Sequence, residues 1–197
     1  RALELLRRAR STVLHQAPPA FYQLAEADRV AGDAEDLALR LVIFGGVHVA
    51  AELVPLARAL GYQTIVADGR PAFLTRERFP DADQLILGWP EEAFAAAGLD
   101  SATAVAVLTH DPKFDDPALM IALRSPAMYV GAIGSKKTQA ARRERLGAAG
   151  LTDAQVARLF GPIGLELGGR SPAETALAIL AEITAVRYGA GSNRRAG

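Results

Sequence analysis

Gly45 and Gly46 stand where an apolar run gives way to a helical periodicity, in the segment GGVHVA at residues 45–50. A strand that turns at glycines into a helix points backbone N–H groups and the positive end of the helix at a phosphate. Asp68 ends the next apolar run, 23 positions after Gly45, where a dinucleotide site needs a carboxylate for the adenosine ribose. This spacing favours phosphate or dinucleotide binding by Gly45, Gly46 and Asp68. The alternative is a tight structural turn, with Asp68 capping a loop.

The two residues after these glycines alter the prediction. A dinucleotide fingerprint has a second glycine at position 47, which lets the backbone approach the diphosphate, whereas this chain has Val47. Its branched side chain would crowd that approach, so we expect weakened or altered dinucleotide affinity. His48 lies just inside the predicted helix, where its imidazole would contact a phosphate or, equally, hydrogen-bond to a nearby carbonyl.

A second glycine turn occurs in the segment GAIGSKK at residues 131–137. It joins a predicted strand to a predicted helix and puts two lysines in the first helical turn. Each exposed cation there opposes the helix dipole at a cost of up to about 1 kcal/mol. This arrangement favours anion binding by Gly134, Ser135 and Lys136; otherwise both lysines simply point into solvent. The glycine spacing excludes a Walker phosphate loop.

The segment THDPK at residues 109–113 follows another apolar run. It should therefore lie at the carboxyl edge of the sheet, where open α/β sheets bind ligands. His110 and Asp111 are candidates for an acid–base pair, and with Thr109 they are expected to line the ligand site. Two side chains are too few to hold a metal ion, so no metal site is predicted. The alternative is a set of solvated or capping loop residues.

A fourth segment, PIGLELGG at residues 162–169, precedes the last predicted helix. It is interpreted either as a loop that closes the sheet or as a flexible wall of the ligand site, with Glu166 directed inward. Ser171, Pro172 and Glu174 then supply a helix start signal, since serine caps, proline fits the first position and glutamate completes a capping box.

Alternating apolar runs and helical periodicities must position these segments. Each run is continuously apolar, as burial on both faces of a parallel sheet requires. The alternation predicts an α/β fold, Rossmann-like and doubly wound, with a mainly parallel sheet and helices on both faces. The helix over 135–149 should expose a strongly basic face, and the last helix should bury Leu177, Leu180 and Ile183. The predicted strands are 41–44, 63–67, 84–87, 104–108 and 128–132, and the predicted helices are 49–60, 91–97, 117–123, 135–149 and 173–187.

Residues 39–188 are expected to form one nucleotide- or cofactor-binding domain. Residues 1–38 are interpreted as an N-terminal helical extension or the remnant of a missing domain, and residues 189–197 as a flexible tail. The 197-residue chain has no cysteine, which excludes disulfides and thiol chemistry and fits a reducing cytoplasm. Its 22 basic and 22 acidic residues leave no surplus charge for nucleic acid, and its apolar runs are too short to cross a membrane.

Taken in order, these segments resemble the XdhC/CoxI family, the accessory proteins of xanthine dehydrogenase and related molybdenum hydroxylases. The resemblance covers about residues 41–187. The chain departs from the family at Val47, at Phe160, where the family usually has histidine, and in its N-terminal part. There the family's separate cysteine-bearing domain is missing or reduced to residues 1–38. The matching motifs are GGVHVA, the strand-end pattern of Asp68, Arg70 and Phe73, RFPDA at 78–82, LTHD at 108–111, YVG at 129–131, GSKK at 134–137, PIG at 162–164 and SPAE at 171–174.

The resemblance implies a Rossmann domain, often C-terminal to another domain, that binds molybdenum cofactor, assists its sulfuration and helps insert it into an apo molybdenum hydroxylase. A sulfur-donating enzyme is then a second expected partner, and a homodimer is a further expectation. An NAD(P)-dependent oxidoreductase and a purely structural partner-binding domain remain alternatives, and whether the chain is an enzyme stays open. The expected cofactor-binding residues are Gly45, Gly46, His48, Asp68, Arg70, Thr109, His110, Asp111, Gly134, Ser135 and Lys136.

These expectations share one geometric requirement. Molybdopterin carries a phosphate or a pyrophosphate-linked nucleotide, and a dinucleotide such as NAD(P) carries a diphosphate. Either ligand requires the Gly45 and Gly134 turns to lie at the same edge of the sheet, with their backbone N–H groups converging on one anionic group.

Overall fold

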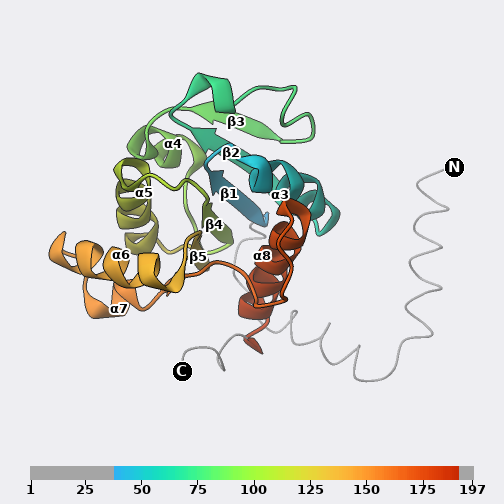
Figure 1. The fold of residues 1–197 in the computed structure, drawn as a ribbon. Coiled ribbons are helices and arrows are strands. Elements are labelled where there is room, and N and C mark those ends of the chain that lie inside the picture. The colour runs from blue at the N-terminus through green and yellow to red at the C-terminus, as the bar shows by residue number, and fades with distance from the viewer. Residues whose placement is uncertain (1–37, 191–197) are drawn as a thin grey trace, which may run out of the picture. The chain divides into compact units, whose positions relative to one another are not determined.

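A six-stranded, wholly parallel sheet is the centre of the computed structural model, which describes residues 38–190. Its strands lie in the order β3-β2-β1-β4-β5-β6 (Figure 1), which is the order of dinucleotide-binding domains. The predicted Rossmann-like fold is therefore confirmed. The predicted extension over residues 1–38 lies, except for its last residue, outside the described residues, as do positions 191–197 of the predicted tail. The strands are β1 (Arg40–Phe44), β2 (Gln63–Asp68), β3 (Gln84–Leu87), β4 (Thr103–Val107), β5 (Tyr129–Ala132) and β6 (Leu159–Phe160).

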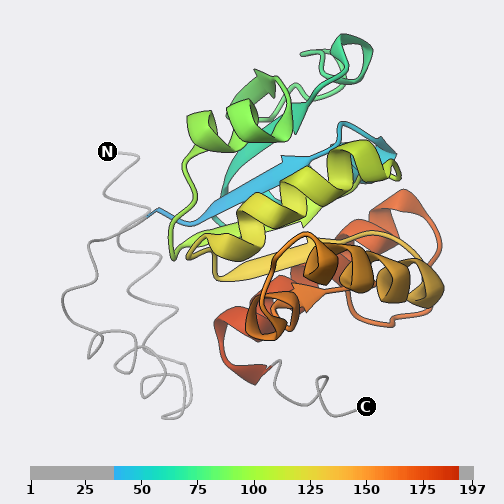
Figure 2. The same ribbon diagram turned by 90° about the vertical axis from the view of Figure 1, so that its left-hand side faces the viewer.

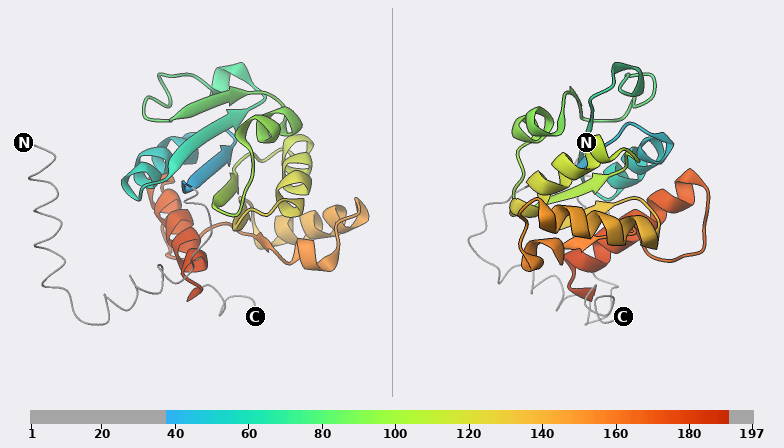
Figure 3. Two further views of the ribbon diagram at one scale, coloured as in Figure 1. Left: turned by 180° about the vertical axis from the view of Figure 1, so that it is seen from behind. Right: turned by 60° about the vertical axis from the view of Figure 1, so that its left-hand side comes forward.

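Helices cover both faces of this sheet (Figures 2 and 3). Helices α3 and α8 pack side by side on one face, and α4, α5 and α6 follow one another across the other. Within residues 38–190 no helix combines the length and the apolar character that crossing a bilayer requires. The helices are α3 (His48–Ala59), α4 (Pro90–Ala97), α5 (Pro112–Arg124), α6 (Lys136–Ala148), α7 (Asp153–Val156) and α8 (Pro172–Arg187), with a 3₁₀ turn, η1 (Pro71–Phe73).

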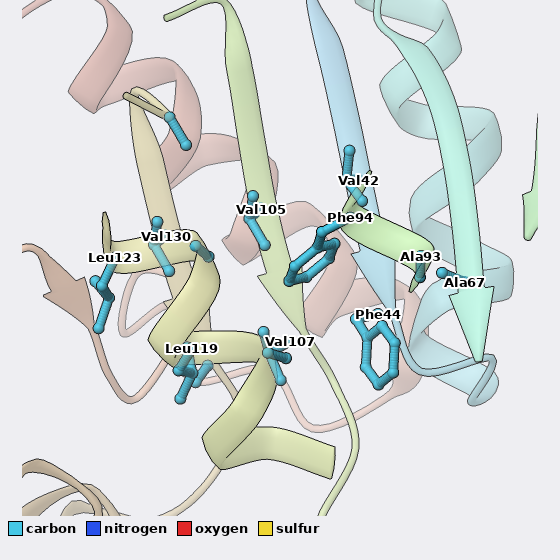
Figure 4. Close-up of a cluster of buried hydrophobic side chains, with 14 of the residues drawn as sticks. Val42, Phe44, Ala67, Ala93, Phe94, Val105, Val107, Leu119, Leu123 and Val130 are labelled. Carbon is cyan, nitrogen blue, oxygen red and sulfur yellow. The ribbon is translucent and has the colours of Figure 1, made fainter. Parts of the chain in front are cut away.

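Two apolar cores, one on each face of the sheet, hold these layers together. Successive residues of β1 alternate between them, because side chains along a strand point to opposite faces. Val42 and Phe44 belong to the core under α4 and α5 (Figure 4), whereas Leu41 and Ile43 belong to the core under α3 and α8. All four side chains are fully buried. Burying a large aliphatic or aromatic side chain contributes roughly 1.5–3 kcal/mol, so this central strand is firmly fixed.

Helix α5 begins five residues earlier than the predicted helix over 117–123. Asp111 caps it, because its carboxylate accepts a hydrogen bond from the Lys113 backbone N–H at 3.0 Å, and Pro112 occupies the first helical position. Pro117, expected to start the helix, instead lies inside it. The short elements β6, α7 and η1 are absent from the predicted elements, since two to four residues carry too little periodicity.

One expected core residue of the last helix is wrong. Leu180 and Ile183 are buried in α8 as predicted, but Leu177 is 55% exposed. Helix α8 faces the sheet with Ala176, Ile179, Leu180 and Ile183, which recur every three or four residues. Leu177 lies beside this stripe rather than in it.

Candidate ligand-binding edge

The two glycine turns lie at the same edge of the sheet, two strands apart. The Gly45 turn follows β1 and the Gly134 turn follows β5, with β4 between them. Since neighbouring strands lie about 4.8 Å apart, the turns are separated by about 10 Å. The end of β4 fills the intervening position, because a Cβ added to Gly45 would lie 2.8 Å from Thr109 Cγ2. Segments after β1, β4 and β5 are thus neighbours at the switch point of the fold.

The backbone N–H groups of the Gly45 turn bond within the protein. Gly45, whose φ of 114° favours glycine, donates to the Ala67 carbonyl at 2.8 Å. Gly46 donates to Asp68 Oδ2 at 2.8 Å, and Val47 donates to the Gly45 carbonyl at 2.9 Å. The following helix, α3, has no side-chain cap and no acidic residue in its first turn, and the His48 side chain is exposed. An anion at this turn would therefore meet the start of α3 rather than the glycine amides.

Asp68 is a buried carboxylate that is fully engaged by its neighbours. Besides the bond from Gly46, it accepts three hydrogen bonds of 2.9 Å from the backbone N–H, Nε and Nη2 of Arg70. Burial alone would raise the pKa of Asp68, but the hydrogen bonds from Arg70 and Gly46 outweigh it and lower that pKa below its ordinary value. The ionised carboxylate thereby fastens the glycine turn to the end of β2. Its expected role in holding a ribose stays a prediction.

The segment that follows β2 packs directly on this glycine turn. The Arg70 guanidinium lies 3.9 Å above the Phe73 ring, within cation–π distance. A Cβ added to Gly46 would lie 2.2 Å from the Phe73 carbonyl oxygen, so only glycine fits there. Arg78 Nη2 donates to the Gly46 carbonyl at 2.9 Å. The sequence predicts that Gly46 binds ligand. In the structure, glycine is required at this position because the Phe73 backbone approaches it closely.

Beneath the ends of β4 and β5 lies a buried ion pair that sequence reasoning misses. Asp115 and Arg142, each about 2% exposed, are joined by a 2.5 Å bond from Arg142 Nη2 to Asp115 Oδ2. The Thr109 hydroxyl donates to the other oxygen of Asp115. Arg142 Nη1 donates to the Ile133 carbonyl at 3.0 Å and to Gln139 Oε1 at 2.8 Å. The pair therefore ties the residues that follow β4 to the residue after β5.

This buried pair bears on the predictions for Thr109 and for the basic helix α6. Thr109, expected to line the ligand site, is 1% exposed and its hydroxyl bonds to a protein carboxylate. The predicted basic face of α6 is exposed at Lys136, Lys137 and Arg145, whereas Arg142 lies on the buried side with Gln139 and Leu146. That spacing of three and four residues is the one signal by which Arg142 could have been recognised as buried. Burial raises the pKa of Asp115, opposed by the bond from Thr109 and the charge of Arg142.

Side chains at the ends of β4 and β5 reach solvent above this pair. His110, Asp111, Ser135 and Lys136 are all exposed. Asp111 caps α5, and Ser135 Oγ caps α6 by accepting from the Thr138 N–H at 3.1 Å. Ser135 Oγ also lies 2.9 Å from Thr138 Oγ1, where either hydroxyl can be the donor. When Thr138 donates, the Ser135 hydroxyl hydrogen is available to an anion.

Lys136 has a partner on the fourth segment. Its Nζ lies 3.3 Å from Glu166 Oε1, and both side chains are more than 75% exposed. Glu166 is solvent-exposed and contacts a predicted ligand-site lysine, so whether its loop forms a wall of the ligand site stays a prediction. The contact places the loop over residues 162–169 beside the Gly134 turn. Exposed ion pairs contribute about 0–1 kcal/mol, so an incoming anion can replace Glu166 on the lysine at little cost.

This arrangement can hold an anion more readily than it can perform acid–base chemistry. Two exposed lysines, Lys136 and Lys137, lie with the Ser135 hydroxyl at the start of α6. The exposed imidazole of His110 follows the neighbouring strand, β4. Among residues 38–190 no group of three or more His, Cys, Asp or Glu side chains is arranged to hold a metal ion. The charges at this end therefore suit a phosphate.

Comparison with known proteins gives a consistent picture. The family model described as the XdhC Rossmann domain matches residues 41–183. A relative from Bacillus subtilis (strain 168), described as a probable xanthine dehydrogenase subunit, is 33% identical over 149 residues, 75% of this chain and 43% of that protein. The molybdenum cofactor insertion chaperone PaoD of Escherichia coli (strain K12) is 30% identical over 149 residues, 76% of this chain and 40% of that protein.

A solved structure shares the fold. A protein from Bacillus halodurans, described as a xanthine dehydrogenase, superposes with a TM-score of 0.66 at 28% sequence identity. The match covers 82% of this chain and 48% of that one. The chain thus spans less than half the length of each of these three relatives.

Proposed function

Because the chain belongs to the family of the XdhC Rossmann domain, we propose that it is an accessory factor that binds molybdenum cofactor and helps insert it into a xanthine-dehydrogenase-type enzyme. The cofactor is cargo here, to be held and passed on. Support comes from the names of two relatives, one a molybdenum cofactor insertion chaperone and the other a probable component of xanthine dehydrogenase.

The observation that carries this proposal is the exposed cationic end of α6. The cofactor is a pterin with a terminal phosphate, and Ser135 and Lys136 present a hydroxyl and an ammonium group at the start of a helix. These groups, with the Gly134 backbone, would hold the phosphate, and His110 at the end of β4 would contact the same ligand. The pterin itself carries the molybdenum, which supplies the redox chemistry of the recipient enzyme. This chain's residues therefore only bind and orient.

Two finer parts of the proposal concern partners. We propose that a sulfur-donating enzyme modifies the cofactor while it is held at this edge, and that the chain acts as a homodimer. Exposed side chains at the ends of β4 and β5 would leave the bound ligand accessible to another protein. Analytical ultracentrifugation of the full chain would test the dimer, since a single species at the monomer mass would contradict it.

An NAD(P)-dependent oxidoreductase is the second candidate, favoured by the strand order and by the glycine turn after β1. It requires a diphosphate on that turn and ribose hydroxyls on Asp68. Both places are engaged by protein groups, and so the accessory role is the stronger proposal. Bound nicotinamide that changes its redox state on addition of a substrate would decide for the oxidoreductase.

Native mass spectrometry of freshly purified protein tests the proposed function. We expect a retained mass that matches a phosphorylated pterin, with or without molybdenum. The charge-reversed variant Lys136→Glu should lose that mass. A matched control is Arg124→Glu, which reverses an exposed charge at the other end of α5, away from the site. A retained nicotinamide dinucleotide in place of the pterin would contradict the proposal.

A further inference from the structure

The segment between β2 and β3 bears on the class of ligand, an inference that rests on the proposed binding function. In dinucleotide-binding domains with this strand order, the diphosphate lies on the first glycine turn and the adenosine ribose on the acidic residue that ends β2. In this chain those positions correspond to the Gly45 turn and to Asp68. Groups of the protein itself contact both.

The diphosphate position offers few free donors. The N–H groups of Gly45, Gly46 and Val47 donate to Ala67, Asp68 and Gly45 respectively, at 2.8–2.9 Å. The Val47 side chain also takes the place of the glycine that lets backbone approach a diphosphate. A diphosphate that bound these three N–H groups would have to break their internal hydrogen bonds first, which leaves it only the uncapped start of α3.

The ribose position is saturated as well. A carboxylate has about four acceptor sites, and Asp68 accepts four hydrogen bonds, three of them from Arg70. Arg70 is itself fixed, because its guanidinium lies 3.9 Å over the Phe73 ring and 5.7 Å from the centre of the Phe114 ring. Ribose hydroxyls could bond to Asp68 only after this arginine had moved away.

Backbone also closes the space above the glycine turn. The Phe73 carbonyl oxygen approaches Gly46 so closely that even a methyl group would lie 2.2 Å from it. Arg78 holds the same glycine through a 2.9 Å bond to its carbonyl oxygen. The segment is thus fastened to the turn from both sides of η1.

We infer that the Arg70–Phe73 segment takes the place of an adenosine diphosphate group, so that this domain rejects dinucleotides and takes a pterin ligand with a single phosphate. Arg70 supplies the cation that pairs with Asp68, and the Phe73 carbonyl covers the turn. The ligand's phosphate is then held at the other end of the site, by Ser135 and Lys136. Arg70 and Phe73 are specificity-determining residues in this scheme.

Isothermal titration of the full chain tests this inference with two probes at one ionic strength, NAD⁺ and a pterin phosphate monoester. The wild-type protein should bind the monoester at least tenfold more tightly than NAD⁺. Arg70→Ala releases the Asp68 carboxylate and should raise the affinity for NAD⁺ at least fivefold. Arg76→Ala is the matched control, since it removes an exposed arginine of the same segment that bonds only to the Ala82 carbonyl. It should leave the NAD⁺ affinity unchanged.

Thermal unfolding of each variant checks that it folds. If Arg70→Ala does not fold, Phe73→Ala replaces it, because this variant keeps the backbone carbonyl but removes the ring that fixes Arg70 on Asp68. Equal affinity of the wild type for NAD⁺ and the monoester, with Lys136→Glu still weakening the monoester, overturns the inference and leaves the proposed function intact. If the monoester fails to bind but Arg70→Ala gains NAD⁺ binding, the proposed function is overturned. The exclusion of dinucleotides by the Arg70–Phe73 segment is then supported. If Arg70→Ala, or Phe73→Ala in its place, binds NAD⁺ no better than the wild type does, the inference that the Arg70–Phe73 segment excludes dinucleotides is overturned.

Discussion

At the ends of β1 and β2 the polar groups of the carboxyl edge bond to one another, whereas at the ends of β4 and β5 they face solvent. Asp68, Arg70 and the Gly46 amide form a closed set, and Asp68 is almost fully buried. Lys136 and its partner Glu166 are more than 75% exposed. Sequence motifs mark both ends equally. A glycine turn in the right place is therefore a binding site only if its donors remain available.

The exposed end is nevertheless held in place by a buried ion pair. The Asp115–Arg142 pair joins the segments after β4 and β5. The closed end is instead fixed by hydrogen bonds from Gly46 to Asp68 and from Arg78 to Gly46. Changes at the two ends should therefore differ in what they damage. The expected effects decrease from the buried pair, through the covered glycine turn, to the titration of Asp68.

Breaking the buried pair should have the largest effect. Arg142→Met leaves Asp115 buried without its cation and should lower the free energy of unfolding by about 3–5 kcal/mol. Arg145→Met is the matched control on the same helix, because Arg145 pairs with Asp116 at a more exposed position, and it should cost about 0–1 kcal/mol. Urea unfolding measures both. Equal losses of unfolding free energy in the two variants would contradict the stabilising role assigned to the buried Asp115–Arg142 pair.

Adding one methyl group to the closed end should have the next largest effect. Gly46→Ala forces the Phe73 carbonyl away from the turn and should lower the free energy of unfolding by about 1–3 kcal/mol, the usual cost of overpacking. Gly147→Ala is the control, because its added Cβ meets nothing within 4 Å inside α6 and should stabilise by about 0.5–1 kcal/mol. A harmless Gly46→Ala in thermal and urea unfolding would show that the turn is not covered.

The closed end should also respond to acid. The folded pKa of Asp68 is lowered below the ordinary value of 3.8, so its ionised form contributes stability that is fully present above that value. This stability is lost as the pH falls below 3.8 through the folded pKa. Asp68→Asn should therefore show a smaller loss of unfolding free energy over this range than the wild type. Parallel pH profiles for the two proteins would exclude the Asp68–Arg70 pair as the cause.

The layered architecture could be predicted because each strand is a continuous apolar run and each long helix carries a clear periodicity. The predicted bounds of β1 to β5, and of α3, α4, α6 and α8, lie within about one residue of those observed. The predicted start of α5 is wrong because Pro117 is a plausible helix start, although Asp111 and Pro112 supply a better one. β6 has only two residues, and no local pattern marks so short a strand.

The site was harder to predict than the fold. Sequence places His110, Ser135 and Lys136 at the carboxyl edge, and the structure exposes all three there. The sequence cannot show which polar groups are already hydrogen-bonded to other groups of the protein. Asp68 bonds to Arg70 only two residues away, and Thr109 bonds to Asp115. These pairings depend on how loops fold back over strand ends, which no residue spacing fixes.

We propose that the end of the sheet formed by β4 and β5 holds the phosphate of the ligand. Calorimetric titration of a pterin phosphate monoester into the wild type, Lys136→Glu and Arg124→Glu tests it most directly. We expect affinity at least tenfold weaker for Lys136→Glu, equivalent to about 1.4 kcal/mol, and wild-type affinity for Arg124→Glu. Unchanged affinity in Lys136→Glu, with the protein folded, would contradict it.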